Sequence, residues 1–92
     1  MIQLSLVVTV YNKELYIAHC LEQIIELYKK TNGQIECIIV NDGSEDNSEI
    51  VINRIIKRYG FFMLINQINK GVSSARNTGM RHARGTFIAF VD

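Results

Sequence analysis

The stretch 36–44 constrains the fold of this chain more than any other. Residues 37–40 are apolar and mostly β-branched, and the run ends abruptly at the turn sequence Asn-Asp-Gly-Ser of residues 41–44. A short apolar run that stops at turn residues is typical of a strand that is buried on both faces in the middle of a parallel sheet. Ligands of open α/β sheets bind at the carboxyl ends of the strands, so we expect a site near Asp42.

Length and charge limit what such a strand can belong to. The chain has 92 residues, with ten basic residues, nine acidic residues and a formal net charge of +1. A chain of this size forms one small domain that buries roughly 60% of its unfolded surface. The balanced charge gives no basic field that would attract nucleic acid, so we expect a ligand that is recognised by local contacts.

The two cysteines are expected to be reduced core residues. Cys20 falls in a predicted helix and Cys37 in the predicted buried strand, in a chain with no signal peptide and no apolar run of about 20 residues. These features favour a cytoplasmic location, with the cytoplasmic face of a membrane as an option for the full-length protein. No metal-ligand spacing of Cys and His is present, so we expect His19 and His82 on helix surfaces.

Apolar runs and helical patterns alternate along the chain. Strands are predicted at 4–10, 36–42, 61–65 and 86–91, and helices at about 14–30, 46–59 and 72–84. Helix-length crossovers between successive strands require parallel strands with right-handed connections. We therefore expect an α/β fold of three layers, α/β/α, with a mostly parallel sheet in the strand order 3-2-1-4, as in half of a doubly wound, Rossmann-like fold.

Two of the predicted helices carry further local expectations. Asp46 is expected to cap the second helix, with Glu49 three residues later completing a capping box. The third helix has small residues at its predicted sheet-facing positions, which are Val72, Ala75, Gly79 and Ala83. Gly79 costs up to about 1 kcal/mol in helix propensity, so we expect the helix backbone to approach the sheet closely there.

In the strand order 3-2-1-4, the topological switch point lies between strands one and four. Tyr11, Asp42 and Asp92 each follow the end of a different strand, so we expect them to converge on one crevice. Neither a G-x-G-x-x-G sequence nor a P-loop is present, which removes the main support for dinucleotide-binding and NTPase functions. A phosphoacceptor receiver domain needs an acidic pair after the first strand, where this chain has Tyr11 and Asn12.

Four segments carry the motifs of a known family. They are 6–14 (LVVTVYNKE), 40–46 (VNDGSED), 69–79 (NKGVSSARNTG) and 85–92 (GTFIAFVD). Together they resemble the amino-terminal, donor-binding half of a family 2, GT-A fold inverting glycosyltransferase, over nearly the whole chain. The sequence departs from the family pattern at Thr9, where Pro is common, and at Asn41, where Asp is common.

The resemblance implies roles for particular residues. Tyr11 matches the aromatic residue that stacks on the nucleotide base, and Asp42 matches the carboxylate that accepts a hydrogen bond from a uracil ring N–H. Arg76 matches an arginine close to the diphosphate, and Asp92 the first aspartate of an Asp-x-Asp motif that holds Mg²⁺ or Mn²⁺. The implied nucleotide-binding set is Thr9, Tyr11, Asn12, Asp42, Gly43, Ser44, Gly71, Arg76 and Asp92.

Each principal site residue also has a structural interpretation. Tyr11 would otherwise close the sheet edge, Asp42 with Gly43 would only mark a turn, and Arg76 would be an exposed helix residue. Because fold does not fix function, the alternative for the protein is a nucleotidyltransferase or a non-catalytic nucleotide-binding module on a related sheet.

The resemblance further implies that residues 1–92 are the nucleotide-sugar-binding part of a larger domain. The intact enzyme is expected to transfer a sugar from a nucleotide diphosphate donor, a UDP-sugar, to the hydroxyl of a glycan, lipid or polysaccharide precursor, with inversion. The second metal aspartate, the acceptor-binding segments and the general base are expected beyond Asp92, so these residues alone should transfer no sugar. We also expect the strand 86–91 to self-associate through its open edge.

Overall fold

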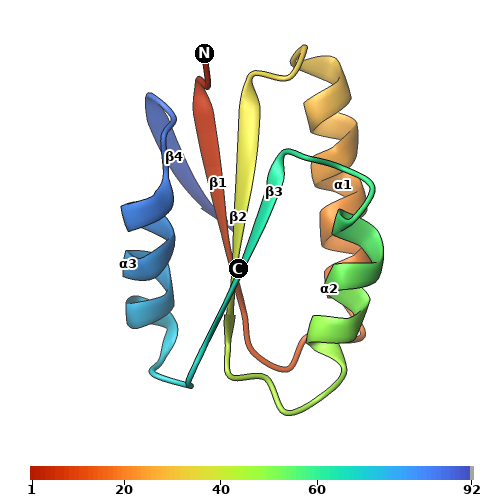
Figure 1. The fold of residues 1–92 in the computed structure, drawn as a ribbon, viewed down its shortest axis with the longest axis vertical. Coiled ribbons are helices and arrows are strands. Elements are labelled where there is room, and N and C mark those ends of the chain that lie inside the picture. The colour runs from red at the N-terminus through yellow and green to blue at the C-terminus, as the bar shows by residue number, and fades with distance from the viewer. Residues whose placement is uncertain (92) are drawn as a thin grey trace.

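A computed structural model describes residues 1–91 of the chain and shows a sheet between two layers of helices (Figure 1). In chain order the elements are β1 (Leu4–Val10), α1 (Ile17–Lys30), β2 (Ile35–Asp42), α2 (Ser48–Ile56), β3 (Phe62–Gln67), α3 (Val72–His82) and β4 (Phe87–Val91). The four strands are parallel, in the order β3-β2-β1-β4. α1 and α2 cover one face of the sheet and α3 covers the other. The predicted α/β class, three layers and strand order are confirmed.

β2 is one of the two inner strands of the sheet, as its apolar run predicted. It pairs with β1 on one side and β3 on the other, and every one of its residues is buried. Side chains alternate along a strand, so Cys37 and Ile39 pack in the core with α1 and α2, while Ile38 and Val40 pack in the core with α3. A strand with a core on both faces cannot slip in register without misplacing an apolar row, and this fixes the position of Asp42 at its end.

α3 lies close against the sheet because small residues face it. Ala75 and Gly79 are buried, and a Cβ added at Gly79 would overlap the side chain of Val7 in β1. The predicted close approach is confirmed at these two positions. The expectation for Val72 is wrong: it is the first residue of the helix and is half exposed. Thr78 is buried in the sheet-facing row instead, where its hydroxyl donates a hydrogen bond to β3.

Two helix starts differ from the prediction because polar side chains bond to the preceding backbone. α1 begins at Ile17 rather than at Glu14, whose N–H donates to the Asp46 carboxylate. The capping box predicted for α2 is also wrong. The helix begins at Ser48, whose N–H and hydroxyl donate to Asp46, and Glu49 accepts a hydrogen bond from β3 instead. Within residues 1–91, no helix combines the length and the apolar character needed to cross a membrane.

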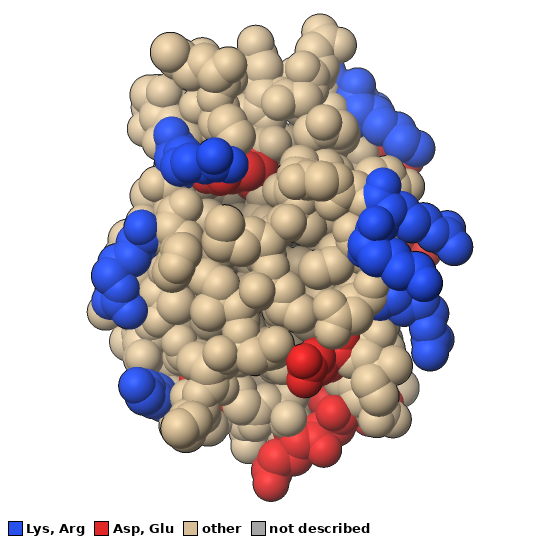
Figure 2. All heavy atoms as spheres, in the orientation of Figure 1, with Lys and Arg blue, Asp and Glu red and all other residues tan. Residues whose placement is uncertain are grey.

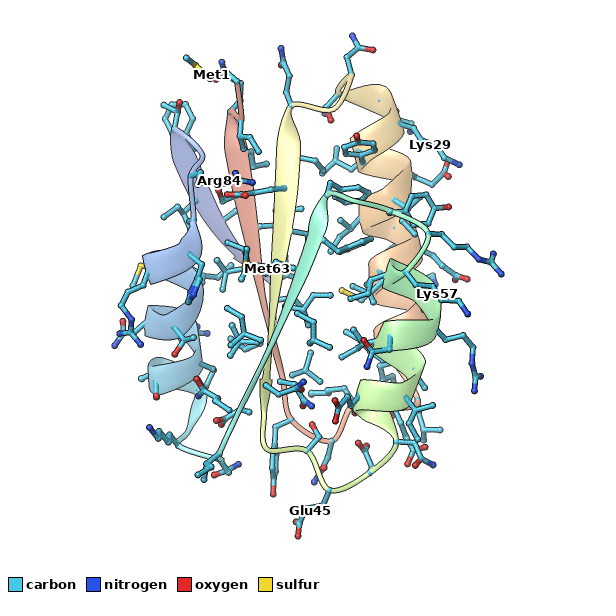
Figure 3. All side chains as sticks on the ribbon, in the orientation of Figure 1. Met1, Lys29, Glu45, Lys57, Met63 and Arg84 are labelled. Atoms are coloured by element: carbon cyan, nitrogen blue, oxygen red, sulfur yellow. The ribbon has the colours of Figure 1, made fainter. Side chains whose placement is uncertain are left out.

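A buried carboxylate joins β1, β2 and the start of β4 at the amino-terminal edge of the sheet. Glu36 accepts hydrogen bonds from Ser5 Oγ at 2.6 Å, from the Arg84 N–H at 2.6 Å, and from the Arg84 guanidinium at 3.1 and 3.2 Å. Arg84 is labelled in Figure 3. Ser5 Oγ in turn accepts the Gly85 N–H at 2.8 Å. Burial alone would raise the pKa of Glu36, but the hydrogen bonds from Ser5 and Arg84 and the Arg84 charge outweigh it, so the pKa lies below its usual value.

β4 forms one edge of the sheet, and its large side chains are poorly covered. Phe87, Ile88 and Phe90 are 67%, 41% and 43% exposed. Exposed aromatic residues beside an open strand edge favour pairing with another chain. Self-association through this strand stays a prediction.

Both cysteines are free thiols, as expected for reduced core residues. Cys37 is buried in β2 and Cys20 is half-buried on α1. Burial raises the pKa of both thiols, so neither is an activated nucleophile.

Candidate functional site

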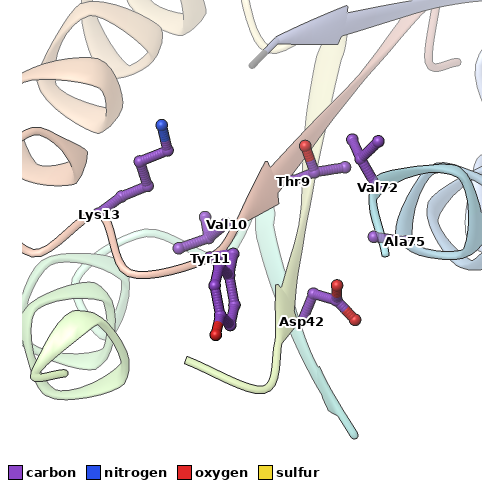
Figure 4. Close-up of a pocket in the computed structure, with 7 residues that line it drawn as sticks. All are labelled: Thr9, Val10, Tyr11, Lys13, Asp42, Val72 and Ala75. Atoms are coloured by element: carbon purple, nitrogen blue, oxygen red, sulfur yellow. The ribbon is translucent and has the colours of Figure 1, made fainter. Parts of the chain in front are cut away.

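A cavity of about 290 Å³ lies between the carboxyl ends of β1 and β2 and the start of α3 (Figure 4). Its lining consists of Thr9, Val10, Tyr11, Lys13, Asp42, Val72 and Ala75. β1 and the loop after it supply the first four residues, β2 supplies Asp42, and α3 supplies the last two. The structure thus brings Tyr11 and Asp42 together at one cavity, although they are separated by a whole β-α-β crossover in the chain.

Asp42 is only 3% exposed, and its carboxylate is held by three donors. Oδ1 accepts Gln67 Nε2 at 2.9 Å and the Lys70 N–H at 2.8 Å, and Oδ2 accepts the Gly71 N–H at 2.9 Å. Burial alone would raise the pKa of Asp42, but these hydrogen bonds and the Lys70 charge outweigh it and hold the pKa below its usual value. Asp42 is therefore an anion at neutral pH, placed at the start of α3, where the helix dipole favours negative charge.

The loop between β3 and α3 is fixed on the end of β2. Asn69 Nδ2 donates to the Asp42 carbonyl at 3.1 Å. Gly43 has a φ of 71°, and a Cβ there would lie 2.5 Å from the Asn69 backbone nitrogen, so glycine meets both the conformational and the spatial requirement. Gly71 precedes α3 with a φ of 97°. The structure explains both glycines by loop geometry, and their role at a nucleotide stays a prediction.

A row of side chains connects Asp42 to α3. Gln67 donates to Asp42 through Nε2 and accepts the Thr78 hydroxyl through Oε1 at 2.8 Å. Arg81 donates to the same Thr78 oxygen at 3.3 Å. These contacts fix the orientation of the Gln67 amide, and therefore the orientation of the carboxylate that lines the cavity.

Of the site residues predicted at the end of β1 and in the first two loops, some line the cavity and others do not. Tyr11 is 43% exposed and lines it together with Thr9. Asn12 and Ser44 do not line it, and the Asn12 N–H donates to Ser44 Oγ at 2.9 Å. A nucleotide contact by either residue stays a prediction.

Arg76 follows Ala75 of the cavity lining directly and reaches towards β4. Its guanidinium carbon lies 5.8 Å from the centroid of the Phe90 ring, a cation–π distance. This contact keeps a cation on the α3 side of the switch point between β1 and β4. Asp92, predicted to approach the same crevice, lies outside the described residues.

Sequence reasoning missed Lys13 as a lining residue. It lies two residues after Tyr11, within the segment 6–14 that carried the family resemblance, so a cation inside that motif was the available signal. Lys13 and Thr9 also border a second cavity of about 290 Å³. That cavity is lined by Val8, Thr9, Lys13, Tyr16, Ile17 and Cys20.

Charge around the cavity is mixed rather than basic. On the face drawn in Figure 2, Lys and Arg lie along both sides, most of the visible Asp and Glu atoms lie in the lower half, and one acidic patch lies beside a basic side chain in the upper half. The lower end, where Figure 3 labels Glu45, is the end at which the loops after β1 and β2 lie. An anionic ligand at this end therefore depends on individual cations such as Lys13 and Arg76, in agreement with the balanced net charge.

The described residues do not fit a divalent cation on their own. Within residues 1–91, no three His, Cys, Asp or Glu side chains are grouped to hold a metal ion. Mg²⁺ and Mn²⁺ need several oxygen ligands, and the one carboxylate lining the cavity, Asp42, already accepts three protein hydrogen bonds. The predicted ligand Asp92 lies outside the described residues.

A family model described as glycosyl transferase family 2 matches residues 5–92 of the chain. The match includes every residue that lines the cavity. The chain belongs to glycosyl transferase family 2. Curated relatives agree with this assignment. The chain spans about a quarter of the length of two of them, EpsH and EpsJ (25% of each).

Two of the relatives, EpsH and EpsJ, are glycosyltransferases by name. Putative glycosyltransferase EpsH of Bacillus subtilis (strain 168) is 48% identical over 88 residues, which is 96% of this chain. Uncharacterized glycosyltransferase EpsJ of the same organism is 43% identical over 88 residues, with the same coverage. Minor teichoic acid biosynthesis protein GgaB, also of Bacillus subtilis (strain 168), is 40% identical over 91 residues, 96% of this chain and 10% of that protein.

Two solved structures, one of them a mannosyltransferase, share the fold. TarS 1-349 of S. aureus superposes with a TM-score of 0.86 and 26% identity, covering 99% of this chain and 27% of that one. Mannosyltransferase PcManGT from Pyrobaculum calidifontis, in complex with GDP-Man and Mn²⁺, gives a TM-score of 0.82 over 94% of this chain and 26% of that one. At 24% identity the second likeness concerns the fold alone. The GT-A fold and the family implied by the motifs are confirmed.

Proposed function

We propose that residues 1–92 form the donor-binding part of a glycosyltransferase, and that the cavity takes the nucleotide of a nucleotide diphosphate sugar. The observation that carries this proposal is the meeting of Tyr11 and Asp42 at one cavity, at the carboxyl ends of neighbouring strands in a family 2 chain. The half-exposed Tyr11 ring offers a stacking face for a base, a contact that suits any base because each has a π-face.

We propose uracil as the base of the donor nucleotide. Oδ1 of Asp42 already accepts two hydrogen bonds, whereas Oδ2 accepts only the Gly71 N–H and retains a free lone pair. One available acceptor suits the single ring N–H of uracil. Guanine presents two adjacent N–H donors that pair best with both carboxylate oxygens, and the corresponding ring nitrogen of cytosine carries no hydrogen.

The diphosphate is proposed to lie among single cations. Lys13 lines the cavity, and Arg76 follows the lining residue Ala75, so both can form charge-assisted hydrogen bonds with phosphate oxygens. In the intact enzyme we propose that Asp92 and residues outside this chain hold Mg²⁺ or Mn²⁺, which would neutralise the leaving diphosphate. The mannosyltransferase of the same fold is in complex with GDP-Man and Mn²⁺, which supports divalent metal use in this class of enzyme.

For the whole protein we propose transfer of the donor sugar to an acceptor hydroxyl with inversion at the anomeric carbon. The acceptor oxygen would attack the anomeric carbon opposite the departing diphosphate, and a base outside residues 1–91 would take the hydroxyl proton. The acceptor would be a glycan, lipid or polysaccharide precursor, and the 92 residues alone would transfer no sugar. The two free thiols support a cytoplasmic location.

Titration calorimetry of the chain with UDP, GDP and CMP tests the donor-binding proposal. UDP is expected to bind best, and Tyr11→Ala is expected to weaken it by about 5- to 150-fold, the affinity equivalent of one base–aromatic stacking contact. Tyr59→Ala is the matched control, since Tyr59 borders a separate groove between α1 and α2. A preference for GDP would overturn the uracil assignment, and unchanged UDP affinity in a folded Asp42→Asn variant would remove Asp42 from the site.

A further inference from the structure

The loop that leads from Tyr11 into α1 is bonded to the loop after β2 by both the side chain and the backbone of Asn12. Asn12 Oδ1 accepts the N–H groups of Glu45 at 2.8 Å and of Asp46 at 3.3 Å. The Asn12 N–H donates to Ser44 Oγ at 2.9 Å. Asn12 therefore holds the second loop through both its backbone and its side chain, and we call these three hydrogen bonds the Asn12 clamp.

The next two residues of the loop extend this attachment. The Lys13 N–H donates to Ser48 Oγ at 2.8 Å, and the Glu14 N–H donates to Asp46 Oδ2 at 3.1 Å. Ser48 is fully buried, and its hydroxyl donates to Asp46 Oδ1 at 2.6 Å. Three successive amides, 12–14, thus donate to side chains of residues 44–48. The segment after Tyr11 is held on one side by β1 and on the other by these contacts.

The backbone at Asn12 is left-handed, a conformation that asparagine adopts more readily than most residues, and the side chain adds contacts that glycine would lack. Asn12 has a φ of 52°, in the left-handed region where non-glycine residues are uncommon. Glycine would adopt this conformation without strain but could not accept the two hydrogen bonds from residues 45 and 46. Asn32, in the exposed turn after α1, has nearly the same φ of 54°.

Asn12 lies next to the cavity without lining it. Tyr11 precedes it directly and supplies a ring to the lining, whereas Asn12 is not part of the lining. Its backbone N–H and its side-chain Oδ1 are both engaged by residues 44–46 of the second loop. This arrangement differs from a direct nucleotide contact by Asn12, which the family resemblance implied.

We infer that Asn12 is a positioning residue of the nucleotide site, which holds the backbone beside Tyr11 so that the ring is ordered before a base stacks on it. The inference rests on the proposed nucleotide-binding function of the cavity. A ring that is already immobile loses little freedom on binding, whereas a ring on a loose loop must be ordered at the expense of affinity. The cost of immobilising one side chain corresponds to about a two- to tenfold loss of affinity.

The variant Asn12→Gly tests this inference because it removes the side-chain hydrogen bonds and tolerates the left-handed backbone. Asn32→Gly is the matched control, with the same substitution at the same φ in a remote turn. UDP affinity is measured by calorimetry for both variants, in the unchanged chain and in the Tyr11→Ala background. We expect Asn12→Gly to weaken UDP about two- to tenfold in the unchanged chain and to have no further effect once Tyr11 is alanine. Asn32→Gly should leave affinity unchanged in both.

A second measurement needs no ligand. Amide hydrogen exchange at residues 12–14 and 45–46 should become faster in Asn12→Gly and stay unchanged in Asn32→Gly. Unchanged exchange in Asn12→Gly would overturn the inference, because the clamp would not be holding the loops. Equal losses of UDP affinity with and without Tyr11 would also overturn it, since Asn12 would then contact the ligand itself. Failure of the unchanged chain to bind UDP, with exchange altered as expected, would instead overturn the proposed function and leave a clamp without a nucleotide role.

Discussion

Replacing Glu36 with alanine is expected to lower the free energy of unfolding by about 3 kcal/mol, because it leaves buried polar groups without an acceptor. The residue is 3% exposed and accepts four hydrogen bonds from Ser5 and Arg84. Without the carboxylate, the fully buried Ser5 hydroxyl and the part-buried Arg84 N–H lose their acceptor. Urea unfolding followed by circular dichroism measures the change.

Glu26→Ala is the matched control for this prediction. Glu26 is an exposed carboxylate on α1 that pairs with Lys29 at 3.4 Å, and such surface pairs contribute about 0–1 kcal/mol. Equal costs for the two variants would contradict the prediction, because the effect would then come from the loss of any acidic side chain rather than from the buried network.

The two hydrogen-bonded carboxylates at opposite ends of β2 predict how stability depends on pH. The folded pKa values of Glu36 and Asp42 both lie below their unfolded values, which are about 4.3 and 3.9. Depressed carboxyl pKa values contribute stability that is fully present above the unfolded pKa and is lost as pH falls through the folded pKa. We therefore expect the free energy of unfolding to decrease below about pH 4, and to decrease less in Glu36→Ala. A profile that is flat down to pH 2 in the unchanged chain would contradict this.

Adding one methyl group at Gly79 is expected to lower the free energy of unfolding by about 2 kcal/mol, although alanine is the better helix former. The new Cβ would overlap the side chain of Val7, a fully buried residue of β1. Valine is β-branched and stiff at χ1, so it cannot turn aside, and α3 must move away from the sheet. Thermal unfolding of Gly79→Ala measures the loss, and reduced UDP affinity would follow the displacement of Ala75 from the cavity.

The substitution Val7→Ala provides the test of this explanation. Val7→Ala alone opens a cavity and is destabilising, but in that background the methyl group at Gly79 occupies the vacated space, so Gly79→Ala should cost about 0 kcal/mol. Gly60→Ala is the control, because no atom lies within 4 Å of the Cβ position there. Additive costs for Val7→Ala and Gly79→Ala would show that the two residues do not compete for space.

The fold was predictable because its main signals are local or periodic. The apolar run ending at Asp42 identified β2, and alternation with helical patterns led to parallel strands in the order 3-2-1-4. Small residues identified the face of α3 at Ala75 and Gly79. These signals are patterns of side-chain size and polarity within short segments, and the same patterns decide which side chains are buried in the fold.

The errors at the helix starts have one physical cause. The backbone of residues 12–14 bonds to Ser44, Asp46 and Ser48, which lie on a different loop. Asp46 therefore serves the loop after β1 as well as the Ser48 amide, and it does not form the capping box that its spacing to Glu49 indicated. A capping box predicted from one segment takes no account of N–H donors from another segment that bond to the same carboxylate.

The sequence by itself determined the sheet order, the family motifs and the placement of Tyr11 and Asp42 at strand ends, since all of these depend on patterns within single elements. Only the tertiary structure decided what those residues do locally. The carboxylate of Asp42 accepts hydrogen bonds from Gln67, Lys70 and Gly71. The loop after Tyr11 is bonded to the loop after β2 through the side chain of Asn12. The physical reason is that hydrogen-bond partners are chosen by distance in space, and in a parallel sheet the polar strand ends meet from segments 25 to 34 residues apart in the chain.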